Sequence, residues 1–344
     1  MKHNQKGMTL IEIMVSLLIG AFLIGGVIKI FTNTHQTYRV QENLSRIQES
    51  GRFAMDILTQ GVRMAGFQGC ASVNDITPSV IIDIKNPNPN PIPPSLTLGV
   101  SQPVTGSNNV AANWNASACG VGNLCIANTD AINIHSGGSC GGNLVGNMGT
   151  VNANIQINAV NTCFINPYDV LMLTDCESVD VFVAVSASSG GGIQTIAHST
   201  TQNTSNNLSK AYQSDAEIFK FNSYTFFIRT GASGEPSLYR LNTNIPASPG
   251  TNPVELIEGV ENMQILYGED TNADNSADYY VPANNVTNMG NVISLRISLL
   301  IRSIEDNLTL TSRDYIYNGV TTTPADNRLR RVFTSTIAVR NRLP

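Results

Sequence analysis

The sequence predicts an α+β protein in which one long N-terminal α-helix packs on a mainly antiparallel β-sheet body. Three observations support this fold class. A charge-free apolar run from Ile13 to Ile28 leads into an amphipathic helical pattern. The second half of the chain holds β-rich segments that do not alternate with helices. Six cysteines all follow the apolar run, which predicts disulfides that tie a loop insertion to the body.

Composition narrows the class of protein. The 344 residues can form one large or two ordinary domains, and their formal net charge is −5. An acidic chain argues against nucleic-acid binding driven by bulk electrostatics. Only 13% of the residues are charged, and Asn, Ser, Thr and Gly supply the remaining polarity. This composition suits a secreted β-rich protein.

The first 31 residues predict a targeting segment. Residues 1–7 are polar and carry Lys2 and Lys6, whereas residues 8–31 form an apolar stretch. At about 1.5 Å per residue, a helix of this length can span a hydrocarbon core of roughly 30 Å. The positive-inside rule keeps residues 1–7 in the cytoplasm and places the body outside it.

Three interpretations of this segment compete. A cleaved secretory signal needs small residues at a cleavage site after the apolar run, and the sequence after Gly25-Gly26 matches that poorly. A plain membrane anchor leaves Glu12 unexplained, because a carboxylate within an apolar span is costly and usually has a partner. The third interpretation is a leader that is removed on the cytoplasmic side, before the apolar run.

A resemblance supports the third interpretation. The run Lys6-Gly7-Met8-Thr9-Leu10-Ile11-Glu12, followed by an apolar helix, resembles the leader of type IV prepilins. The resemblance implies that a prepilin peptidase cuts between Gly7 and Met8 and that Met8 is then N-methylated. It also implies that Glu12 pairs with the free amine of a neighbouring Met8 and so sets the register of a new subunit, since a lone carboxylate in a dry fibre core is costly. The alternative is a Glu12 side chain that only lies near the membrane surface.

The helical pattern continues through residues 32–66. Apolar or small residues recur along one face at spacings of four and three, as in an amphipathic helix that packs under a sheet. They are Val40, Leu44, Ile47, Gly51, Ala54, Leu58, Gly61 and Ala65. The helix is expected to run from Met8 to about Ala65 and to end at Gly66. The exit Arg63-Met64-Ala65-Gly66-Phe67-Gln68-Gly69-Cys70 resembles that of the PilW group of minor pilins.

The remainder, residues 67–344, is expected to form an extracellular β-rich body with disulfides. The candidates are Cys70, Cys119, Cys125, Cys140, Cys163 and Cys176. Six cysteines allow 15 pairings. The spacing suggests Cys119–Cys125 and Cys163–Cys176 as local loops, which leaves Cys70 with Cys140. Zinc binding is the rival interpretation, but the chain has no C-x₂-C pair and only four histidines.

Residues 86–168 are expected to be an irregular, low-charge loop insertion with short strands. Asp130 is their only charged residue, and they open with a proline-rich run. A functional interpretation is an exposed contact surface for another pilin or another surface. The alternative is a decoration that only keeps the body soluble.

Eight β-rich, partly alternating segments predict the strands of the body. They are residues 168–173, 179–185, 193–198, 218–228, 237–242, 254–267, 292–302 and 329–339. Residues 223–228, 236–240 and 332–341 also resemble PilW proteins. The basic C-terminus contains Arg328, Arg330, Arg331, Arg340 and Arg342. DNA contact is one interpretation of these arginines, and a solvated edge strand with charges against aggregation is the favoured one.

A carboxylate-rich loop predicts calcium as the one candidate cofactor. Positions 1, 3, 5, 7 and 9 of a calcium-loop pattern are filled by Asp270, Asn272, Asp274, Ser276 and Asp278. Asn275 stands where glycine would make the sharp turn, and Val281 stands where an EF-hand has its bidentate Glu. The loop is therefore not an EF-hand but a weaker candidate site, with Glu269 as a spare ligand. The alternative is a solvated, Asx-rich turn.

These features favour a structural protein over an enzyme. The resemblance implies a minor pilin that joins other minor pilins in a priming complex at the fibre tip and supports motility, adhesion or DNA uptake. It implies partners among the major pilin, the prepilin peptidase, inner-membrane assembly proteins and a tip adhesin. It places the chain in the inner membrane, with a periplasmic body, before assembly into an extracellular pilus. The alternative is a minor pseudopilin of a type II secretion system.

A tethered enzyme is disfavoured by the motifs. The chain has neither G-x-S-x-G nor H-E-x-x-H, and His135 and His198 are isolated in the sequence.

Overall fold

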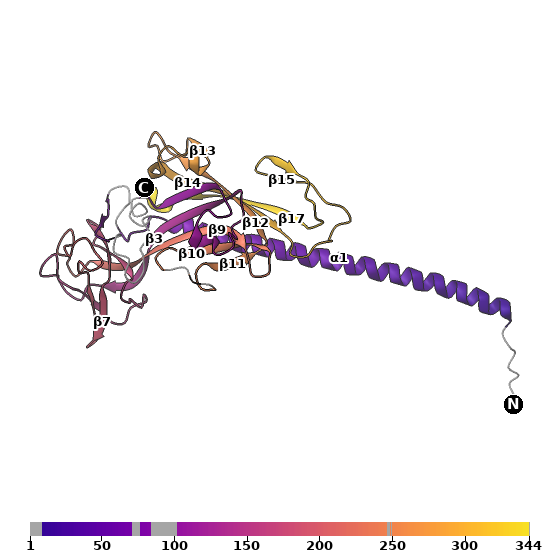
Figure 1. The fold of residues 1–344 in the computed structure, drawn as a ribbon, viewed down its shortest axis with the longest axis horizontal. Coiled ribbons are helices and arrows are strands. Elements are labelled where there is room, and N and C mark those ends of the chain that lie inside the picture. Colours follow the sequence, from indigo (N-terminus) through magenta and orange to yellow (C-terminus); the bar gives the residue numbers. More distant parts are fainter. Residues whose placement is uncertain (1–8, 71–75, 84–101, 246–247, 249, 344) are drawn as a thin grey trace, which may run out of the picture.

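The computed structural model describes residues 9–70, 76–83, 102–245, 248 and 250–343. Its longest element is α1, Leu10–Met64, whose 55 residues extend over about 82 Å. Ala65 caps its C-terminal end, and Gly66 follows with φ = 74°, a conformation that glycine adopts readily. Figure 1 shows α1 leaving the β-rich body as a long arm that carries the N-terminus. The predicted long helix is confirmed, with its first residue at Leu10.

The two halves of α1 have different surroundings. From Leu10 to Phe31, the large hydrophobic side chains are between 47% and 76% exposed. An 18-residue window of the helix has a mean hydropathy of 2.4, and none of it is buried in the body. This half is long and apolar enough to cross a membrane. The second half packs against the body through one buried face.

The largest sheet has eight strands. They are β1 (Ser79–Val80), β2 (Val104–Val110), β3 (Thr129–Asn143), β5 (Val170–Thr174), β6 (Val179–Val183), β9 (Glu217–Thr230), β10 (Pro236–Asn242) and β11 (Val254–Glu258). The main path runs β1-β6-β5-β9-β10-β11, while β3 pairs with both β9 and β2. Only the short β1–β6 pair is parallel.

Smaller sheets complete the body. An antiparallel sheet of four strands has the order β13 (Tyr279–Val281), β12 (Val260–Glu269), β14 (Val292–Arg302) and β17 (Arg330–Ala338). A three-stranded sheet has the order β4 (Ile155–Asn158), β8 (Ile193–Ala197) and β7 (Ser186–Gly190), and β15 (Tyr315–Tyr317) pairs with β16 (Val320–Thr322). The short helices are α3 (Ala116–Cys119), η1 (Ala283–Asn285), η2 (Met289–Asn291) and η3 (Arg340–Arg342).

The main hydrophobic core lies between α1 and the two larger sheets. Leu58 of α1, Phe226 of β9 and Leu295 of β14 all belong to this one cluster. Fully burying a leucine side chain contributes roughly 1.5–3 kcal/mol, so the helix face and both sheets stabilise one another. A second cluster lies around Phe182 and Tyr212 and includes side chains of β4 and β8. Figure 1 shows the lobe that carries β7 lying beyond the C-terminal end of α1.

The buried face of α1 differs in part from the predicted one. Ile47, Gly51, Ala54, Leu58 and Ala65 are buried as expected. Leu44 is 39% exposed, whereas Asn43 and Val62 are buried instead. The reason is geometric. The predicted alternation of four and three averages 3.5 residues per turn, which drifts around a helix of 3.6 residues per turn.

The region expected to be a loop insertion is more regular than predicted. Within residues 86–168, the 15-residue strand β3 pairs with β9 over most of its length and contributes Ile132 and Ile134 to the main core. Its many Gly, Ser and Asn residues concealed it, because a strand with neighbours on both sides does not depend on its own β propensity. The proline-rich start of the region lies outside the described residues.

The bounds of the other predicted strands agree with the structure within a few residues, except that one predicted strand is divided in two. The segment 254–267 is two strands, β11 and β12, which belong to different sheets. Gly259 separates them with φ = 86°. The chain can therefore turn from one sheet into the other at a residue without a Cβ.

All six cysteines form disulfides, but only one predicted pair is right. The structure pairs Cys119 with Cys125, Cys70 with Cys176, and Cys140 with Cys163. The expected Cys163–Cys176 and Cys70–Cys140 pairs are wrong. Cys70–Cys176 ties the exit of α1 to the turn between β5 and β6, across a sequence separation of 106 residues. Long-range proximity of this kind depends on sheet topology, which cysteine spacing does not report.

We expect the contact between Gly51 of α1 and Phe333 of β17 to be intolerant of a larger side chain. A Cβ at Gly51 would overlap the Phe333 ring. Gly51→Leu should therefore lower the free energy of unfolding by about 1–3 kcal/mol. Chemical denaturation of the full chain in detergent micelles measures this.

Gln48→Leu adds the same side chain at an exposed position of α1 and is the matched control. The double variant Gly51→Leu/Phe333→Ala should recover part of the loss, because the smaller residue on β17 makes room. Equal stability of the Gly51→Leu and Gln48→Leu variants would contradict the expected clash.

Candidate functional sites

The first site is the N-terminal turn of α1. Thr9 is the N-cap, and its Oγ1 accepts a hydrogen bond of 3.4 Å from the backbone N–H of Glu12. In return, Oε2 of Glu12 accepts bonds from the backbone N–H of Thr9 at 2.9 Å and from its hydroxyl at 3.0 Å. This reciprocal arrangement is a capping box, which the T-x-x-E spacing before an apolar run could have revealed.

The capping box gives Glu12 a local partner at the start of the helix. Its side chain is exposed, so one carboxylate oxygen remains accessible to a further partner. The predicted cleavage and methylation positions, Gly7 and Met8, lie outside the described residues. Cleavage, methylation and the register role of Glu12 therefore stay predictions.

The second site is the carboxylate-rich loop between β12 and β13. Asp270 accepts backbone N–H bonds from Asn272, Ala273 and Asn275. The described residues contain no cluster of three His, Cys, Asp or Glu side chains that could hold a metal.

The other side chains of the loop also bond within it. Asp274 accepts from the N–H of Ser276 at 2.8 Å, and Asp278 accepts from the N–H of Thr271 at 2.8 Å. The side-chain amide of Asn272 donates to both Asp274 and Asp278. These bonds fit the Asx-rich turn, and calcium binding at this loop stays a prediction.

Glu269, the predicted spare ligand, is buried beside this loop, and its carboxylate has partners within the protein. Its carboxylate accepts backbone N–H bonds from Thr287 at 3.1 Å and Asn288 at 2.8 Å, and a hydroxyl bond from Tyr279 at 2.9 Å. Burial by itself raises the pKa of Glu269, but these donors bring the net pKa below its ordinary value. The carboxylate therefore ties the end of β12 to β13 and to the segment before β14.

The third site is the basic C-terminus, where Arg328 and Arg330 make ion pairs within the body. Arg330 of β17 contacts Glu261 at 2.7 Å and Asp326 at 2.6 Å. Arg328 contacts Glu235 at 2.9 Å, and Arg302 of β14 contacts the same carboxylate at 2.7 Å. The Arg330 guanidinium holds the pKa of Asp326 at about 2.

This network joins both larger sheets, because Glu235 precedes β10 and Glu261 lies in β12. The Arg330 side chain is only 5% exposed. The edge-strand interpretation is confirmed by the position of β17 in its sheet. The arginines that lead into it are engaged in ion pairs and are not simply solvated.

Asp130, the only charged residue in its region of the sequence, also joins the two sheets. Its Oδ1 accepts from the N–H of Asn109 in β2 at 2.8 Å, and its Oδ2 accepts from the N–H of Ile265 in β12 at 2.7 Å. Burial raises the pKa of this carboxyl, although the two N–H donors oppose the shift. Sequence analysis singled out the charge but had no means to assign its partners.

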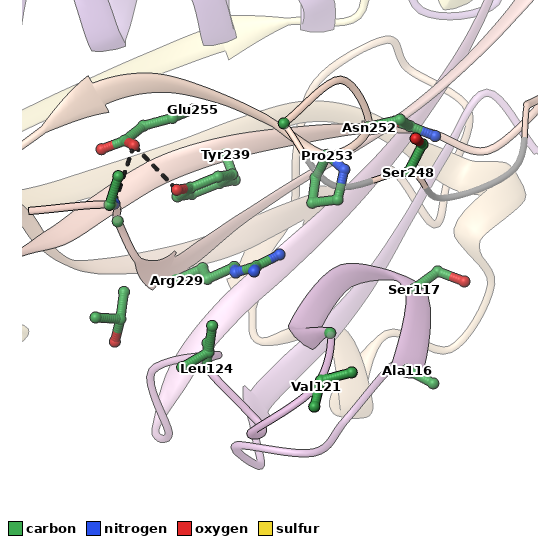
Figure 2. Close-up of a pocket in the computed structure, with 15 residues that line it drawn as sticks. Ala116, Ser117, Val121, Leu124, Arg229, Tyr239, Ser248, Asn252, Pro253 and Glu255 are labelled. Atoms are coloured by element: carbon green, nitrogen blue, oxygen red, sulfur yellow. Dashed lines mark hydrogen bonds between the residues drawn. The ribbon is translucent and has the colours of Figure 1, made fainter. Parts of the chain in front are cut away.

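A pocket beside α3 and β9–β11 was not predicted from the sequence. Figure 2 shows Arg229, Tyr239 and Glu255 lining it together with Val121 and Leu124. Arg229 donates to the carbonyl of Ala118 at 3.0 Å and lies over the Tyr239 ring, and the Tyr239 hydroxyl donates to Glu255 at 3.0 Å. The described residues of its lining include no histidine and no free thiol, so they form a surface hollow without a nucleophile–base pair.

The two buried histidines occupy separate packing sites. His135 stacks on Phe221, and His198 packs against Phe182 while its Nε2 lies 2.9 Å from the carbonyl oxygen of Ala153. Burial lowers the pKa of His135 to about 4. Neither ring nitrogen of His135 has a hydrogen-bond partner among the described residues. It is therefore a neutral core side chain that supports the β3–β9 pair.

Comparison with known proteins adds two family matches. Residues 225–341 match the model of type IV pilus-assembly protein W, and residues 2–28 match the prokaryotic N-terminal methylation motif. No curated protein and no solved structure matches the chain. The first match begins in the second half of β9 and ends within η3, so it includes the carboxylate-rich loop and the arginine network. Together the two matches support a PilW-like minor pilin of a type IV pilus.

We expect the buried His135 to make the protein less stable in mild acid. Its folded-state pKa of about 4 lies below the ordinary value near 6.5. Its contribution is therefore complete above about pH 6.5 and is lost as the pH falls toward 4. The loss can reach about 3 kcal/mol. Denaturant unfolding at several pH values from about 7 to about 4, a range that spans both pKa values of His135, measures this loss.

In the His135→Leu variant, the free energy of unfolding should change much less over that pH range. His35→Leu, at an exposed position of α1, is the control and should keep the wild-type slope. An unchanged slope in His135→Leu would show that another group carries the acid sensitivity.

Proposed function

We propose that this chain is a minor pilin that helps to prime a type IV pilus in a tip complex with other minor pilins. The observation that carries the proposal is α1. Its exposed apolar half can lie first in the inner membrane and then in a fibre core, and its buried half holds the body to it. The match to the methylation motif at residues 2–28 supports processing by a prepilin peptidase.

One feature of the body favours an end position in the fibre. The lobe that carries β7 extends beyond the C-terminal end of α1, on the side away from the N-terminus (Figure 1). In a fibre of parallel helices, that space is where the body of the next subunit toward the tip would lie. A subunit with such a lobe fits best where no further subunit follows. The body would then start the fibre, while major pilins add below it at the membrane.

The alternative is a minor pseudopilin of a type II secretion system, which would share the leader and the long helix. The match to the pilus-assembly family over residues 225–341 favours the pilus. Motility and adhesion follow from pilus function and are part of the proposal, as are inner-membrane assembly proteins and a tip adhesin as partners.

Mass spectrometry of membranes and sheared fibres tests the proposal. Wild-type cells should yield a chain without residues 1–7 and with one methyl group on Met8, and cells without the prepilin peptidase should yield the uncut chain. The chain should occur in sheared pili at low stoichiometry. An uncut N-terminus in wild-type cells, or a cut after Gly25, would refute the pilin assignment. Recovery only with a secretion system would favour the pseudopilin.

A second experiment separates the two possible roles of Glu12. If its charge pairs with the amine of a neighbouring subunit, Glu12→Gln should reduce incorporation into pili at least tenfold while the chain still accumulates in the membrane. Thr9→Val removes the N-cap hydroxyl but keeps the carboxylate, so it is the matched control. Immunoblots of pilus and membrane fractions measure both variants. Equal losses in the two variants would assign Glu12 a capping role alone.

A further inference from the structure

We propose that the segment between β14 and β17 contacts the lipid headgroups of the membrane that holds α1, with Leu310 inserted into the interface. This membrane-contact segment comprises residues 303–329. The inference goes beyond the proposed function, and it rests only on membrane anchoring by the apolar half of α1.

Two contacts with α1 place the segment close to the membrane. The side-chain amide of Gln36 donates to the backbone carbonyl of Leu308 at 2.9 Å, and Arg39 forms an ion pair of 2.9 Å with Glu305. Figure 1 shows β15 and its connections on the side of the body that faces the N-terminal end of α1. The segment therefore follows the helix toward its apolar half.

The distance along α1 sets the depth of the segment. Gln36 is five residues beyond Phe31, where the apolar stretch ends, so it lies about 7.5 Å further along the helix axis. The headgroup region adds roughly 5–8 Å on each side of the hydrocarbon core. The Leu308 carbonyl is thus held at the outer border of the headgroups, and Leu310 is two residues further along the same loop.

The exposed side chains of the segment suit an interface. Within residues 250–343, the large hydrophobic side chains that are more than half exposed all lie in it: Leu310 at 100%, Ile316 at 68% and Val320 at 61%. Thr309 and Thr311 flank Leu310 without adding charge. An exposed aliphatic side chain beside a membrane exit gains burial by entering the acyl boundary.

The charged side chains of the segment, apart from Arg313, have partners within the protein. Glu305 is paired with Arg39, and Asp306 accepts N–H bonds from Asn307 and Asn327. Asp314 accepts a bond from the hydroxyl of Thr323. Arg313 is exposed and makes no ion pair with any described residue, so its guanidinium can contact lipid phosphates.

Tryptophan fluorescence in lipid nanodiscs tests the proposal. Trp114 is the only tryptophan, so a Trp114→Phe background leaves no other. Leu310→Trp is then placed in full-length chains, one per nanodisc of phosphatidylethanolamine and phosphatidylglycerol. Lipids brominated near the headgroup should quench its emission at least twofold, with a shift to shorter wavelength. Ile316→Trp is a second probe of the same segment.

Val160→Trp is the matched control, because Val160 is 89% exposed and lies two residues after β4, which belongs to the same three-stranded sheet as β7. Its emission should not be quenched. The proposal is overturned if Leu310→Trp and Ile316→Trp are quenched no more than Val160→Trp. It is also overturned if the shift of Leu310→Trp emission to shorter wavelength appears only with several chains per nanodisc, which would identify a neighbouring subunit as the partner. Disulfide mapping of each variant confirms that the body is folded.

Discussion

The structure depends on one helix that lies in two different environments along a single axis. The half from Leu10 to Phe31 offers its apolar side chains to the outside, whereas the half beyond residue 40 buries a narrow face in the body. That face packs against strands of both larger sheets, and Gly51 lets β17 approach the helix to within contact of Phe333. Because close-packed cores deform little, this packing holds the body in a fixed position relative to α1.

A chain with few charges uses several of them to hold its sheets together. Asp130 accepts backbone N–H groups from strands of both larger sheets, and Glu269 ties the end of β12 to the connection that precedes β14. The arginines near β17 meet carboxylates of β12 and of the β9–β10 turn. Buried polar groups of this kind are costly when a partner is missing, so they favour one arrangement of the strands over others. The three disulfides add constraints that suit an oxidising compartment.

This construction fits a subunit whose helix must place a body at a defined height above the membrane. The distal lobe lies past one end of the body, and the membrane-contact segment lies toward the other (Figure 1). The lobe has its own hydrophobic cluster around Phe182 and Tyr212, whereas α1 and the two larger sheets share the main core between the lobe and the membrane-contact segment. The region that matches the pilus-assembly family includes the four-stranded sheet of β12, β13, β14 and β17. It does not include the lobe that carries β7.

The sequence by itself determined the long helix, the resemblance to pilins, most of the strands from residue 168 onward and the even number of cysteines, because each is written in local periodicity or in a contiguous motif. It also marked Asp130 and the carboxylate-rich loop. Only the tertiary structure decided the disulfide partners, the place of β3 in the main sheet, the break at Gly259 and the ion pairs of Arg328 and Arg330. These features join residues far apart in the chain, and their partners are selected by sheet topology and burial, which local sequence does not encode.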